Sequence, residues 1–311
     1  MPKLVIVFPG ALGDFLLALP TFRLLRHRHH GVRTTLVVGG PLRELAGLSG
    51  LAEQVASVDD ASTAWLFGGT TMPAWLTGRP VVFSWLGRDR ALGDRLALVA
   101  GSVRLLGVER GAGLEHTSVA YSRAAGWPAR PAELAAHARI APSPSPRARA
   151  LLAGLSRPVL AIHRGAGSPA KRWGRDGFAA VVDEWRRTAG SVIELLGPAE
   201  AMDDPLAGAV LARDWRLDDV AALLGSVDAY AGNDSGVSHL AAAVGCQGVA
   251  LFTSTDPARW APLGRAVIAI GDGATEHESA SAPTVTAARV LEALRRRESL
   301  TSSDLGSSVR A

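Results

Sequence analysis

The amino-acid sequence predicts an α/β protein of two domains, each built on a parallel sheet. At the amino end, an apolar strand from Lys3 to Phe8 is followed by a glycine turn, P-G-A-L-G-D-F, and a helix. The same order of strand, small-residue loop and helix returns with Pro158 to His163. Between them, residues 126–146 are rich in proline, which cannot lie inside a helix or a central strand. We therefore predict domains at residues 1–145 and 146–298, followed by a flexible tail at 299–311.

The composition suits two ordinary domains and excludes several classes of protein. Of the 311 residues 48% are hydrophobic, yet the longest apolar runs are only long enough for strands, not for a membrane span. The single cysteine, Cys246, excludes an internal disulfide and a multi-cysteine metal site, and we expect it to be buried. Because lysine is almost absent and aromatic residues make up 5%, no nucleic-acid interface is expected. Pro2-Lys3 leads directly into the first strand, so we expect no signal peptide and a protein of the cytoplasm, with at most peripheral contact at the inner face of the membrane.

Positive charge is concentrated in the first half of the chain. Residues 1–155 hold 17 Lys and Arg against 10 Asp and Glu, whereas the remainder holds 16 against 19. A basic half would attract an acidic partner. Its densest piece, Arg23 to Arg33, closes the first helix, where basic residues are favoured by the helix dipole in any case. A solvated helix end is therefore the simpler interpretation of this piece.

The turn after the first strand offers a carboxylate, Asp14, at the start of a helix that runs to about His29. The spacing Gly10-x-x-Gly13 differs from the dinucleotide pattern G-x-G-x-x-G, and no acidic residue ends the second strand, Thr34 to Val38. NAD binding is therefore disfavoured here. The two glycines allow a backbone or a substrate to come close. Asp14 is either a charge that suits a helix start or a general base aimed into a cleft.

The rest of the first domain is predicted less regularly. We expect helices at Pro41 to Leu51 and Ala91 to Leu106, and a third strand at Gln54 to Val58. A glycine-rich, irregular region lies between, and its tryptophans are expected to anchor the core and loops: Trp65, Trp75 and Trp85. Polar points near the later helix are candidates to face a cleft: Arg88, Arg90, Arg95 and Arg104.

The second domain opens with a basic loop of small residues. After the strand Pro158 to His163 comes R-G-A-G-S-P-A-K-R-W, and then a helix from Asp176 to Arg187. The polar side chains of this loop would suit a diphosphate: Arg164, Ser168, Lys171 and Arg172. The alternative is a Lys-Arg pair that is merely solvated.

An acidic residue, Glu200, follows the second strand of this domain, Ser191 to Leu196. This is where a ribose hydroxyl pair is commonly bound, although Glu200 could equally start the next helix. Farther on, a short helix is expected at Leu217 to Leu224, the last strand at Ala266 to Ile270, and a closing helix at Thr284 to Arg297 that could pack back on the first domain.

Polar residues also begin the helix expected at Val237 to Val244, after a strand at Asp228 to Ala231. They form the turn Asn233, Asp234, Ser235 and Gly236. Free backbone N–H groups and the positive end of the helix dipole would make this turn an anion site, unless Asp234 or Ser235 simply caps the helix. His239 lies one helical turn beyond Ser235 and shares its face, where it is either a ligand or a satisfied helix histidine.

Four motifs together resemble glycosyltransferase family 9, the heptosyltransferases that build the lipopolysaccharide core from ADP-heptose. They are G-A-L-G-D at 10–14, G-A-G-S-P-A-K-R-W at 165–173, G-P-A-E at 197–200, and G-N-D-S-G-V-S-H-L-A at 232–241 with the following T-D-P-A-R-W. Each motif alone is weak, but their combination, in order along nearly the whole chain, is specific.

The resemblance implies a glycosyltransferase-B fold, with two facing Rossmann-like domains and a cleft between them. The first domain would hold the acceptor and the second the nucleotide-sugar donor, and the transfer would invert the anomeric carbon without a metal or other cofactor. The resemblance makes Asp14 the catalytic base, Lys171 the donor-phosphate lysine and Glu200 a donor-ribose carboxylate. Ser235 stands where the family often has threonine, which keeps the hydroxyl.

The chemistry of these residues agrees with that assignment. Inversion needs a base for the acceptor's proton and stabilisation of the departing diphosphate. Asp14 can supply the first; Lys171, with the helix starts near Ser168 and Ser235, can supply the second. The expected donor residues are Gly13, Ser168, Lys171, Arg172, Glu200, Asn233, Asp234, Ser235, Gly236 and His239. The expected acceptor residues are Gly10, Arg88 and Arg90.

The sequence leaves the substrates open. Nothing in the residues themselves chooses adenine or heptose, and the basic first half suits a phosphorylated saccharide such as the lipopolysaccharide inner core, with other glycans or natural products as alternatives. Three other functions remain alternatives: a sugar-nucleotide epimerase, a nucleotide-dependent oxidoreductase, and a non-catalytic nucleotide-sugar-binding protein. The oxidoreductase is disfavoured because the sequence lacks the dinucleotide pattern G-x-G-x-x-G.

Overall fold

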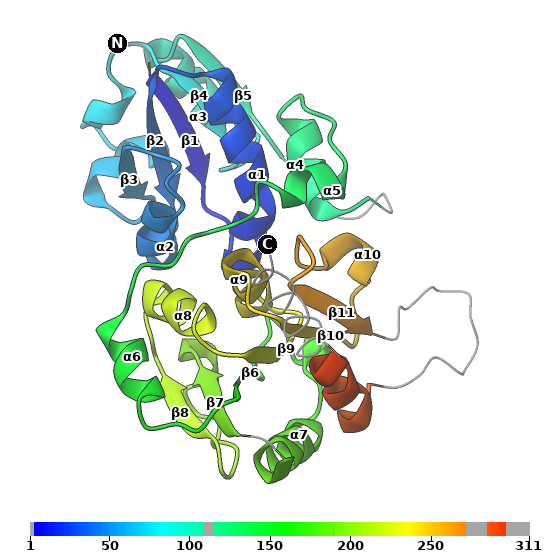
Figure 1. Ribbon diagram of the computed structural model, residues 1–311. Helices are drawn as coiled ribbons and strands as arrows, with labels where there is room; N and C mark the ends of the chain where they lie inside the picture. Colours follow the sequence, from blue (N-terminus) through cyan, green and yellow to red (C-terminus); the bar gives the residue numbers. More distant parts are fainter. Residues whose placement is uncertain (1–2, 108–114, 189, 272–284, 297–311) are drawn as a thin grey trace, which may run out of the picture. The chain divides into compact units, whose positions relative to one another are not determined.

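The computed structural model describes residues 3–107, 115–188, 190–271 and 285–296 (Figure 1). The chain divides into two compact units, Met1–Ala141 and Pro142–Ala311. Each unit contains one sheet in which every neighbouring pair of strands is parallel. None of the described helices is long and apolar enough to cross a membrane.

The first domain has a five-stranded sheet in the order β3-β2-β1-β4-β5. Its strands are β1 (Lys3–Phe8), β2 (Arg33–Val38), β3 (Gln54–Ser57), β4 (Val81–Ser84) and β5 (Ser102–Leu105). Its helices are α1 (Leu12–Arg28), α2 (Arg43–Leu48), α3 (Arg90–Val99), α4 (Thr117–Ala124) and α5 (Pro131–Ala135), with 3-10 turns η1 (Gly40–Leu42), η2 (Ala61–Phe67) and η3 (Ala74–Leu76). The predicted opening of strand, glycine turn and helix is confirmed, and β1 is buried at the centre of the sheet.

Two parts of the first domain differ from the prediction. The helix expected at Ala91 to Leu106 ends at Val99, and the edge strand β5 follows because Gly101 donates its N–H to the Pro80 carbonyl and turns the chain alongside β4. Strand β4 itself was not predicted, since four residues between glycine-rich turns give too short a pattern. The expectation for Trp65 and Trp75 is confirmed, because both are buried in the core of this sheet.

The second domain has a six-stranded sheet in the order β11-β10-β9-β6-β7-β8. Its strands are β6 (Val159–His163), β7 (Ser191–Leu196), β8 (Val210–Arg213), β9 (Ala229–Asn233), β10 (Gly248–Phe252) and β11 (Val267–Gly271). Its helices are α6 (Pro146–Leu152), α7 (Arg175–Thr188), α8 (Leu217–Leu224), α9 (Gly236–Val244) and α10 (Pro257–Trp260), with 3-10 turns η4 (Pro169–Lys171) and η5 (Pro198–Glu200). Cys246 is buried as expected, which raises the pKa of its thiol to about 12.

The closing helix, residues 287–296, belongs to the second domain (Figure 1, red). Its buried side chains Val290, Leu291 and Leu294 share one core with Phe178 and Val182 of α7. The closing helix is thus part of the core of the second domain. The expectation that it also packs back on the first domain stays a prediction. The predictions for segments 272–284 and 297–311, the tail included, lie outside the described residues.

The proline-rich connection is more ordered than predicted. Pro131 and Pro146 each occupy the start of a short helix, α5 and α6, rather than a bare linker. Proline suits this first position because the N–H that it lacks would have no partner inside the helix.

The strand orders place a switch point in each sheet. In the second domain the chain runs outward from β6 through β7 to β8, then returns to β9 on the other side of β6. In the first domain β4 likewise lies on the side of β1 opposite to β2. In parallel α/β sheets, ligands bind beyond the carboxyl ends of the strands at such points. The loops after β6, β9 and β1 are therefore where a site is expected.

Candidate functional site

Three neighbouring strands of the second domain end in polar side chains. Strand β6 ends at His163, β7 leads into η5 with Glu200, and β9 leads into Asp234 and Ser235 before α9. Because β7, β6 and β9 are adjacent and parallel, these residues meet at one edge of the sheet. His163 was not singled out from the sequence, although a polar residue that ends the apolar run P-V-L-A-I-H is a usable signal.

Lys171 reaches the start of α9. Its Nζ lies 2.7 Å from Asp234 Oδ2, and the same oxygen accepts a hydrogen bond of 2.6 Å from the Thr255 hydroxyl. The ammonium also lies 5.8 Å from the centre of the Trp260 ring. A hydrogen bond from Thr253 to the Ala170 carbonyl ties the loop after β10 to this segment. Lys171 and the Asp234 turn, both expected at the donor, are thus in contact. Thr255 and Trp260 adjoin them; both belong to the motif T-D-P-A-R-W but were not among the expected donor residues.

The capping alternative for this turn is not what the structure shows. Ser235 stands at the N-cap position of α9 but accepts no capping hydrogen bond from the helix. Its hydroxyl contacts His163 Nδ1 instead, at 3.2 Å, while Asp234 is engaged with Lys171 and Thr255. Gly236 begins α9 and His239 is buried one turn later. The first backbone N–H groups of α9 are thus not capped by a side chain of Ser235.

Asn233 holds the basic loop in place. Its side chain is fully buried, its Oδ1 accepts from the Trp173 backbone N–H at 3.0 Å, and its Nδ2 donates to the Arg164 carbonyl at 2.6 Å. These two bonds fix both ends of the loop that carries Ser168 and Lys171. Asn233 was expected to contact the donor, but in this structure its side-chain amide forms hydrogen bonds with the backbone of this loop.

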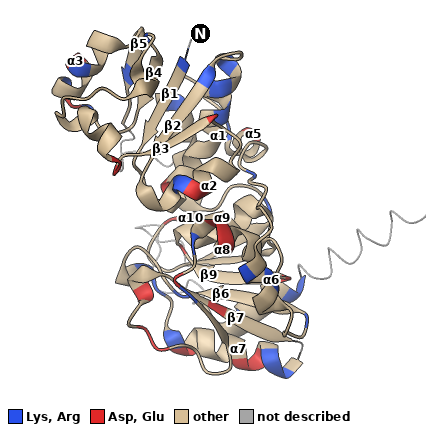
Figure 2. Ribbon diagram, turned by 90° about the vertical axis from the view of Figure 1, so that its left-hand side faces the viewer, with Lys and Arg blue, Asp and Glu red and all other residues tan. Residues whose placement is uncertain are grey.

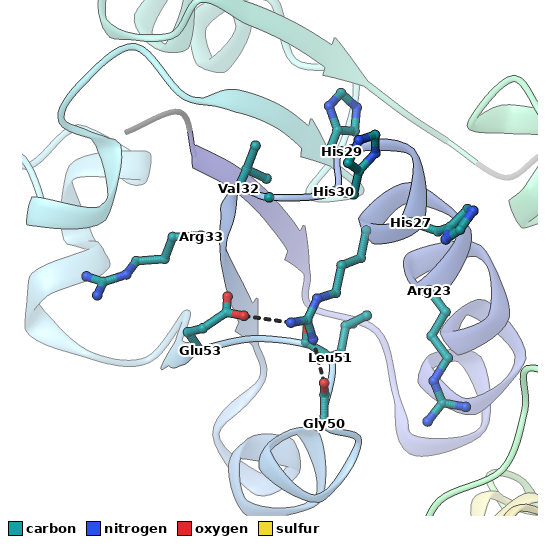
Figure 3. A pocket seen from close by; sticks show the side chains of 11 residues that line it. Arg23, His27, His29, His30, Val32, Arg33, Gly50, Leu51 and Glu53 are labelled. Carbon is teal, nitrogen blue, oxygen red and sulfur yellow. Dashed lines mark hydrogen bonds and ion pairs between the residues drawn. The ribbon is translucent and has the colours of Figure 1, made fainter.

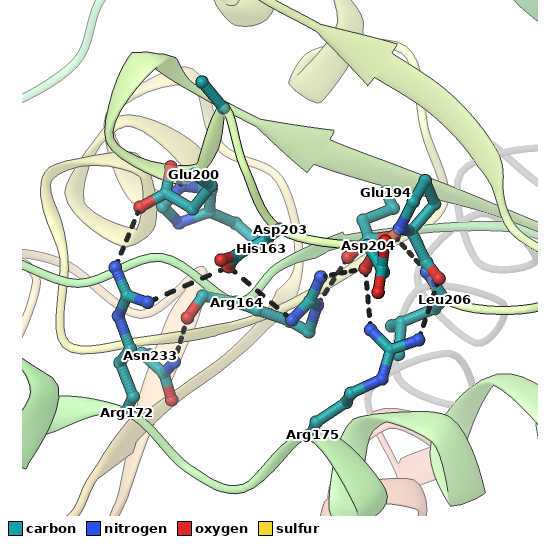
Figure 4. Close-up of polar contacts among 12 residues, drawn as sticks. His163, Arg164, Arg172, Arg175, Glu194, Glu200, Asp203, Asp204, Leu206 and Asn233 are labelled. Atoms are coloured by element: carbon teal, nitrogen blue, oxygen red, sulfur yellow. Dashed lines mark hydrogen bonds and ion pairs between the residues drawn. The ribbon is translucent and has the colours of Figure 1, made fainter.

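Glu200 is 4% exposed and sits in a close polar cluster (Figure 4). One carboxylate oxygen accepts from the Gly197 N–H at 3.1 Å and lies 3.8 Å from His163 Nε2, and the other lies 3.5 Å from Arg172. The pKa of Glu200 is held below its usual value, chiefly by His163, and against the opposing effect of burial. Gly165 is required here because a Cβ at that position would lie only 2.3 Å from the carboxylate.

Arg164 was expected to add positive charge to the diphosphate loop, but it does not. It is buried, with its Nε 2.5 Å from the fully buried Glu194, and it also donates to the Asp204 carbonyl at 2.8 Å (Figure 4). Glu194 in turn accepts from the Leu206 N–H at 2.6 Å. This ion pair lies in the scaffold that supports the loop. The cations of the loop that are not buried are Lys171 and Arg172.

In the first domain, Asp14 lies in the first turn of α1, two residues after Leu12. The hydroxyl of Tyr121, on α4, donates a hydrogen bond of 3.0 Å to Asp14 Oδ1. The Tyr121 ring packs against Phe8 at 5.6 Å between centres, and Trp85 lies 6.1 Å from Phe8. Gly10 is needed above Phe8, because a Cβ there would lie 2.5 Å from that ring. Gly13 follows in the same first turn of α1.

Tyr121 could not be found from the sequence, since no element was predicted around it. Arg88 and Arg90, the expected acceptor cations, are exposed at the loop after β4 and the start of α3, and Arg90 lies 3.7 Å from Asp94. This loop follows the carboxyl end of β4, the strand next to β1.

The basic piece Arg23 to Arg33 lies at the opposite, amino edge of the first sheet, at the end of α1 (Figure 2). It lines a hollow of about 640 Å³ (Figure 3). Arg26 donates to the carbonyls of Gly50 and Leu51 and pairs with Glu53, while Arg23 donates to the Ser49 and His137 carbonyls. In Figure 3 the side chains of Arg23 and Arg33 point away from each other. Arg23 and Arg26 therefore connect the helix end to neighbouring segments through hydrogen bonds, whereas the simpler interpretation expected a solvated helix end.

The described residues contain no group of three or more His, Cys, Asp or Glu side chains arranged to hold a metal ion. Within this part of the chain, the polar side chains at the strand ends of the second domain are instead paired with one another and with backbone groups.

Comparison with known proteins adds a family. A model of glycosyltransferase family 9 (heptosyltransferase) matches residues 72–287. The Escherichia coli ADP-heptose lipopolysaccharide heptosyltransferase II is similar in structure, with a TM-score of 0.72, 18% identity, and coverage of 96% of this chain and 99% of that one. A family 9 glycosyltransferase from Veillonella parvula gives 0.72 at 16% identity, covering 96% and 97%. No curated protein sequence matches the chain.

The E. coli heptosyltransferase WaaC with ADP is also similar, with a TM-score of 0.64 at 15% identity and coverage of 94% of this chain and 99% of that one. At such identities the structures show a shared fold. The predicted glycosyltransferase-B class is confirmed on this ground, together with the two parallel sheets.

Proposed function

The chain belongs to glycosyltransferase family 9, and from that premise we propose that it transfers heptose from ADP-heptose to a saccharide hydroxyl. The observation that carries this proposal is the meeting of Lys171, Glu200 and Ser235 at one edge of the second sheet, beside its switch point. A cation, a carboxylate and an uncapped helix start are the groups that a nucleoside diphosphate needs. Two of the similar structures are of the E. coli heptosyltransferase WaaC, one with ADP and one with ADP-2-deoxy-2-fluoro heptose.

On the donor side, Lys171 and the N–H groups at the start of α9 would bind the diphosphate, with Ser168 and Arg172 beside them. Glu200 would accept from the ribose hydroxyls, because its low pKa keeps it ionised and thus an acceptor only. Asp234 neutralises Lys171 in this structure, so the diphosphate would share or replace that contact. This exchange stabilises the charge that builds up on the phosphate as the sugar leaves.

On the acceptor side, Asp14 would act as the general base. It would take the proton of the acceptor hydroxyl while that oxygen forms its bond to the anomeric carbon and the bond from this carbon to the phosphate oxygen breaks. ADP then leaves with the electron pair, and the anomeric carbon is inverted. The hydroxyl of Tyr121 supports this role because it holds Asp14 Oδ1 in one orientation.

The acceptor that we propose is a phosphorylated saccharide, such as one of the lipopolysaccharide inner core. The excess of Lys and Arg in residues 1–155 favours an anionic partner. Gly10 and Arg88 lie in loops that follow β1 and β4, and Arg90 begins α3. We place the reaction in the cytoplasm and expect it to need no metal ion.

Binding of nucleotides tests this function first. Thermal unfolding would be followed with ADP, UDP, GDP, NAD and ADP-heptose, each with and without EDTA. A ligand at about 100 times its Kd stabilises the folded state by about 2.7 kcal/mol, which gives a measurable rise in Tm. We expect ADP and ADP-heptose alone to raise Tm. If Tm rose only with another nucleotide, the assignment of ADP-heptose as the donor would be wrong. If EDTA abolished the rise in Tm, the expectation that no metal ion is needed would be wrong.

A further inference from the structure

His163 connects two of the proposed donor residues. It is the last residue of β6, the strand between β7 and β9, and its side chain is only 7% exposed. On one side its Nε2 lies 3.8 Å from Glu200 Oε2, and on the other its Nδ1 lies 3.2 Å from the Ser235 hydroxyl. One imidazole thus spans from the carboxylate expected to bind ribose to the hydroxyl at the start of α9. The role inferred for this histidine rests on the proposed function of these two neighbours.

The neighbours of the ring decide where its proton sits. Glu200 has a lowered pKa and is therefore ionised near neutral pH, so it can only accept hydrogen bonds. A ring nitrogen with a bare lone pair would be repelled by this carboxylate. The neutral imidazole is therefore favoured with its hydrogen on Nε2, toward Glu200, and with a lone pair on Nδ1.

That tautomer fixes the direction of the Ser235 hydrogen bond. Since Nδ1 then accepts, the Ser235 hydroxyl must donate its hydrogen to His163. Ser235 is left with lone pairs toward any ligand at the start of α9. A phosphate oxygen is also an acceptor, so in this state Ser235 offers it no hydrogen bond.

A second proton on His163 reverses this arrangement. The imidazolium donates from both nitrogens, and Ser235 accepts from Nδ1. The hydroxyl hydrogen is then no longer donated to His163 and is available to a phosphate oxygen, with the Tyr230 hydroxyl as the competing acceptor, and one positive charge is added beside the site. Both changes favour a bound diphosphate.

We propose that His163 is a positioning residue that sets the direction of the Ser235 hydrogen bond, so that binding of a nucleoside diphosphate is coupled to uptake of a proton by His163. The proton comes from solvent and is bound at Nδ1; no bond to carbon is made or broken.

Other charged and titratable groups lie on the elements next to β6 and are part of this balance. On β7 and η5 and just after them these groups are Glu194, Glu200 and Asp203, and on the loop after β6 they are Arg164, Lys171 and Arg172. On β9, just after it and on α9 they are Tyr230, Asp234 and His239. Arg164 is paired with Glu194, Lys171 with Asp234, and Arg172 with Glu200 and Asp203. Because each of these three cations already faces a carboxylate, a charge gained by His163 is not simply repelled by them.

The test is calorimetric titration with ADP in two buffers of different ionisation enthalpy at pH 7, which counts the protons taken up per ADP. The variant His163→Gln keeps a donor and an acceptor on the side chain but cannot gain a proton. We expect the wild type to take up more protons per ADP than His163→Gln. The protonation of ADP itself is the same in both titrations and cancels. His137→Gln, an exposed histidine of the first domain, is the matched control and should equal the wild type.

The pH dependence of affinity gives a second readout. ADP affinity of the wild type should fall between pH 6 and pH 8 by more than that of His163→Gln, whose curve should follow the protonation of ADP alone. Ser235→Ala should lose more affinity at pH 6 than at pH 8, roughly tenfold against little, because only the protonated histidine frees the hydroxyl. Thermal unfolding checks that each variant is folded.

Equal proton uptake by the wild type and His163→Gln, or a loss in Ser235→Ala that does not depend on pH, would overturn the coupling. If ADP bound tightly with equal uptake, the donor assignment would stand and the role of His163 would fall. If neither protein bound ADP, both would fall.

Discussion

The two domains position their candidate residues by different means. In the second domain Glu200, His163 and Ser235 come from three adjacent strand ends and contact one another through polar atoms. In the first domain Asp14 is fixed by its place on α1 and by the hydroxyl of Tyr121, whose ring packs on Phe8. The donor side is thus a connected polar cluster, and the base side is a carboxylate held by an aromatic neighbour. Changes in the polar cluster of the second domain should alter donor binding, and changes around Asp14 in the first domain should alter turnover.

Asp14→Asn is expected to show the largest difference between an effect on turnover and an effect on donor binding. Removal of the base should lower kcat by about 10² to 10⁴ and leave ADP affinity unchanged, since Asp14 belongs to the first domain. Turnover is measured as ADP release and affinity by calorimetry. Turnover at the wild-type rate would show that Asp14 is not the base.

The scaffold beneath the donor cluster should respond through stability. Glu194→Ala leaves the buried Arg164 without its partner, and we expect a loss of about 3 to 5 kcal/mol in the free energy of unfolding. Urea denaturation measures it. Glu292→Ala, which breaks an exposed pair with Arg296 on the closing helix, is the control and should cost far less. A similar cost for both would mean that the buried pair contributes nothing special.

Lys171→Ala should weaken ADP binding by about 10- to 100-fold, because a charge-assisted contact to phosphate is lost. Asp234 would then lose its cation as well, so the fold must be checked by thermal unfolding. Lys3→Ala offers a matched control, since Lys3 lies on β1 and donates to Ala74 and Thr77. Titration that gives the same Kd for Lys171→Ala and the wild type would remove Lys171 from the site.

The smallest effect concerns pH. The pKa of Glu200 is lowered in the folded protein, chiefly by His163, so its contribution to stability is full above the pKa of the unfolded chain and is lost as pH falls through the folded pKa. The wild type should therefore lose Tm more steeply than Glu200→Gln on acidification below about pH 4.5. Parallel Tm curves for the two proteins would contradict this linkage.

The sequence predicted the central features of both sheets. Strands such as β1 and β7 were placed at their observed bounds, because long buried runs of apolar residues give a clear pattern. Strands β4, β5 and β8, of four residues each, were missed, whereas β3, an edge strand of the same length, was predicted at Gln54 to Val58. With four residues a strand shows at most two repeats of its period, so such strands are easily overlooked in the sequence.

The candidate site was predicted by position but not by contact. Glu200 and Ser235 were correctly placed just after their strands, yet the ring of His163 between them depends on β6 lying between β7 and β9. That strand order cannot be read from local patterns. Tyr121 reaches Asp14 from 107 residues away, through a helix that was not predicted. The roles of these residues stay predictions until the variants are measured.

The central claim is sugar transfer from ADP-heptose to a hydroxyl, and product analysis tests it most directly. The protein would be incubated with ADP-heptose and a phosphorylated core saccharide in EDTA, with Asp14→Asn beside it. We expect ADP and glycosylated acceptor in equal amounts, with the anomeric configuration inverted, and far slower formation of both by the variant. Conversion of the donor to an isomer without any modified acceptor would contradict this account.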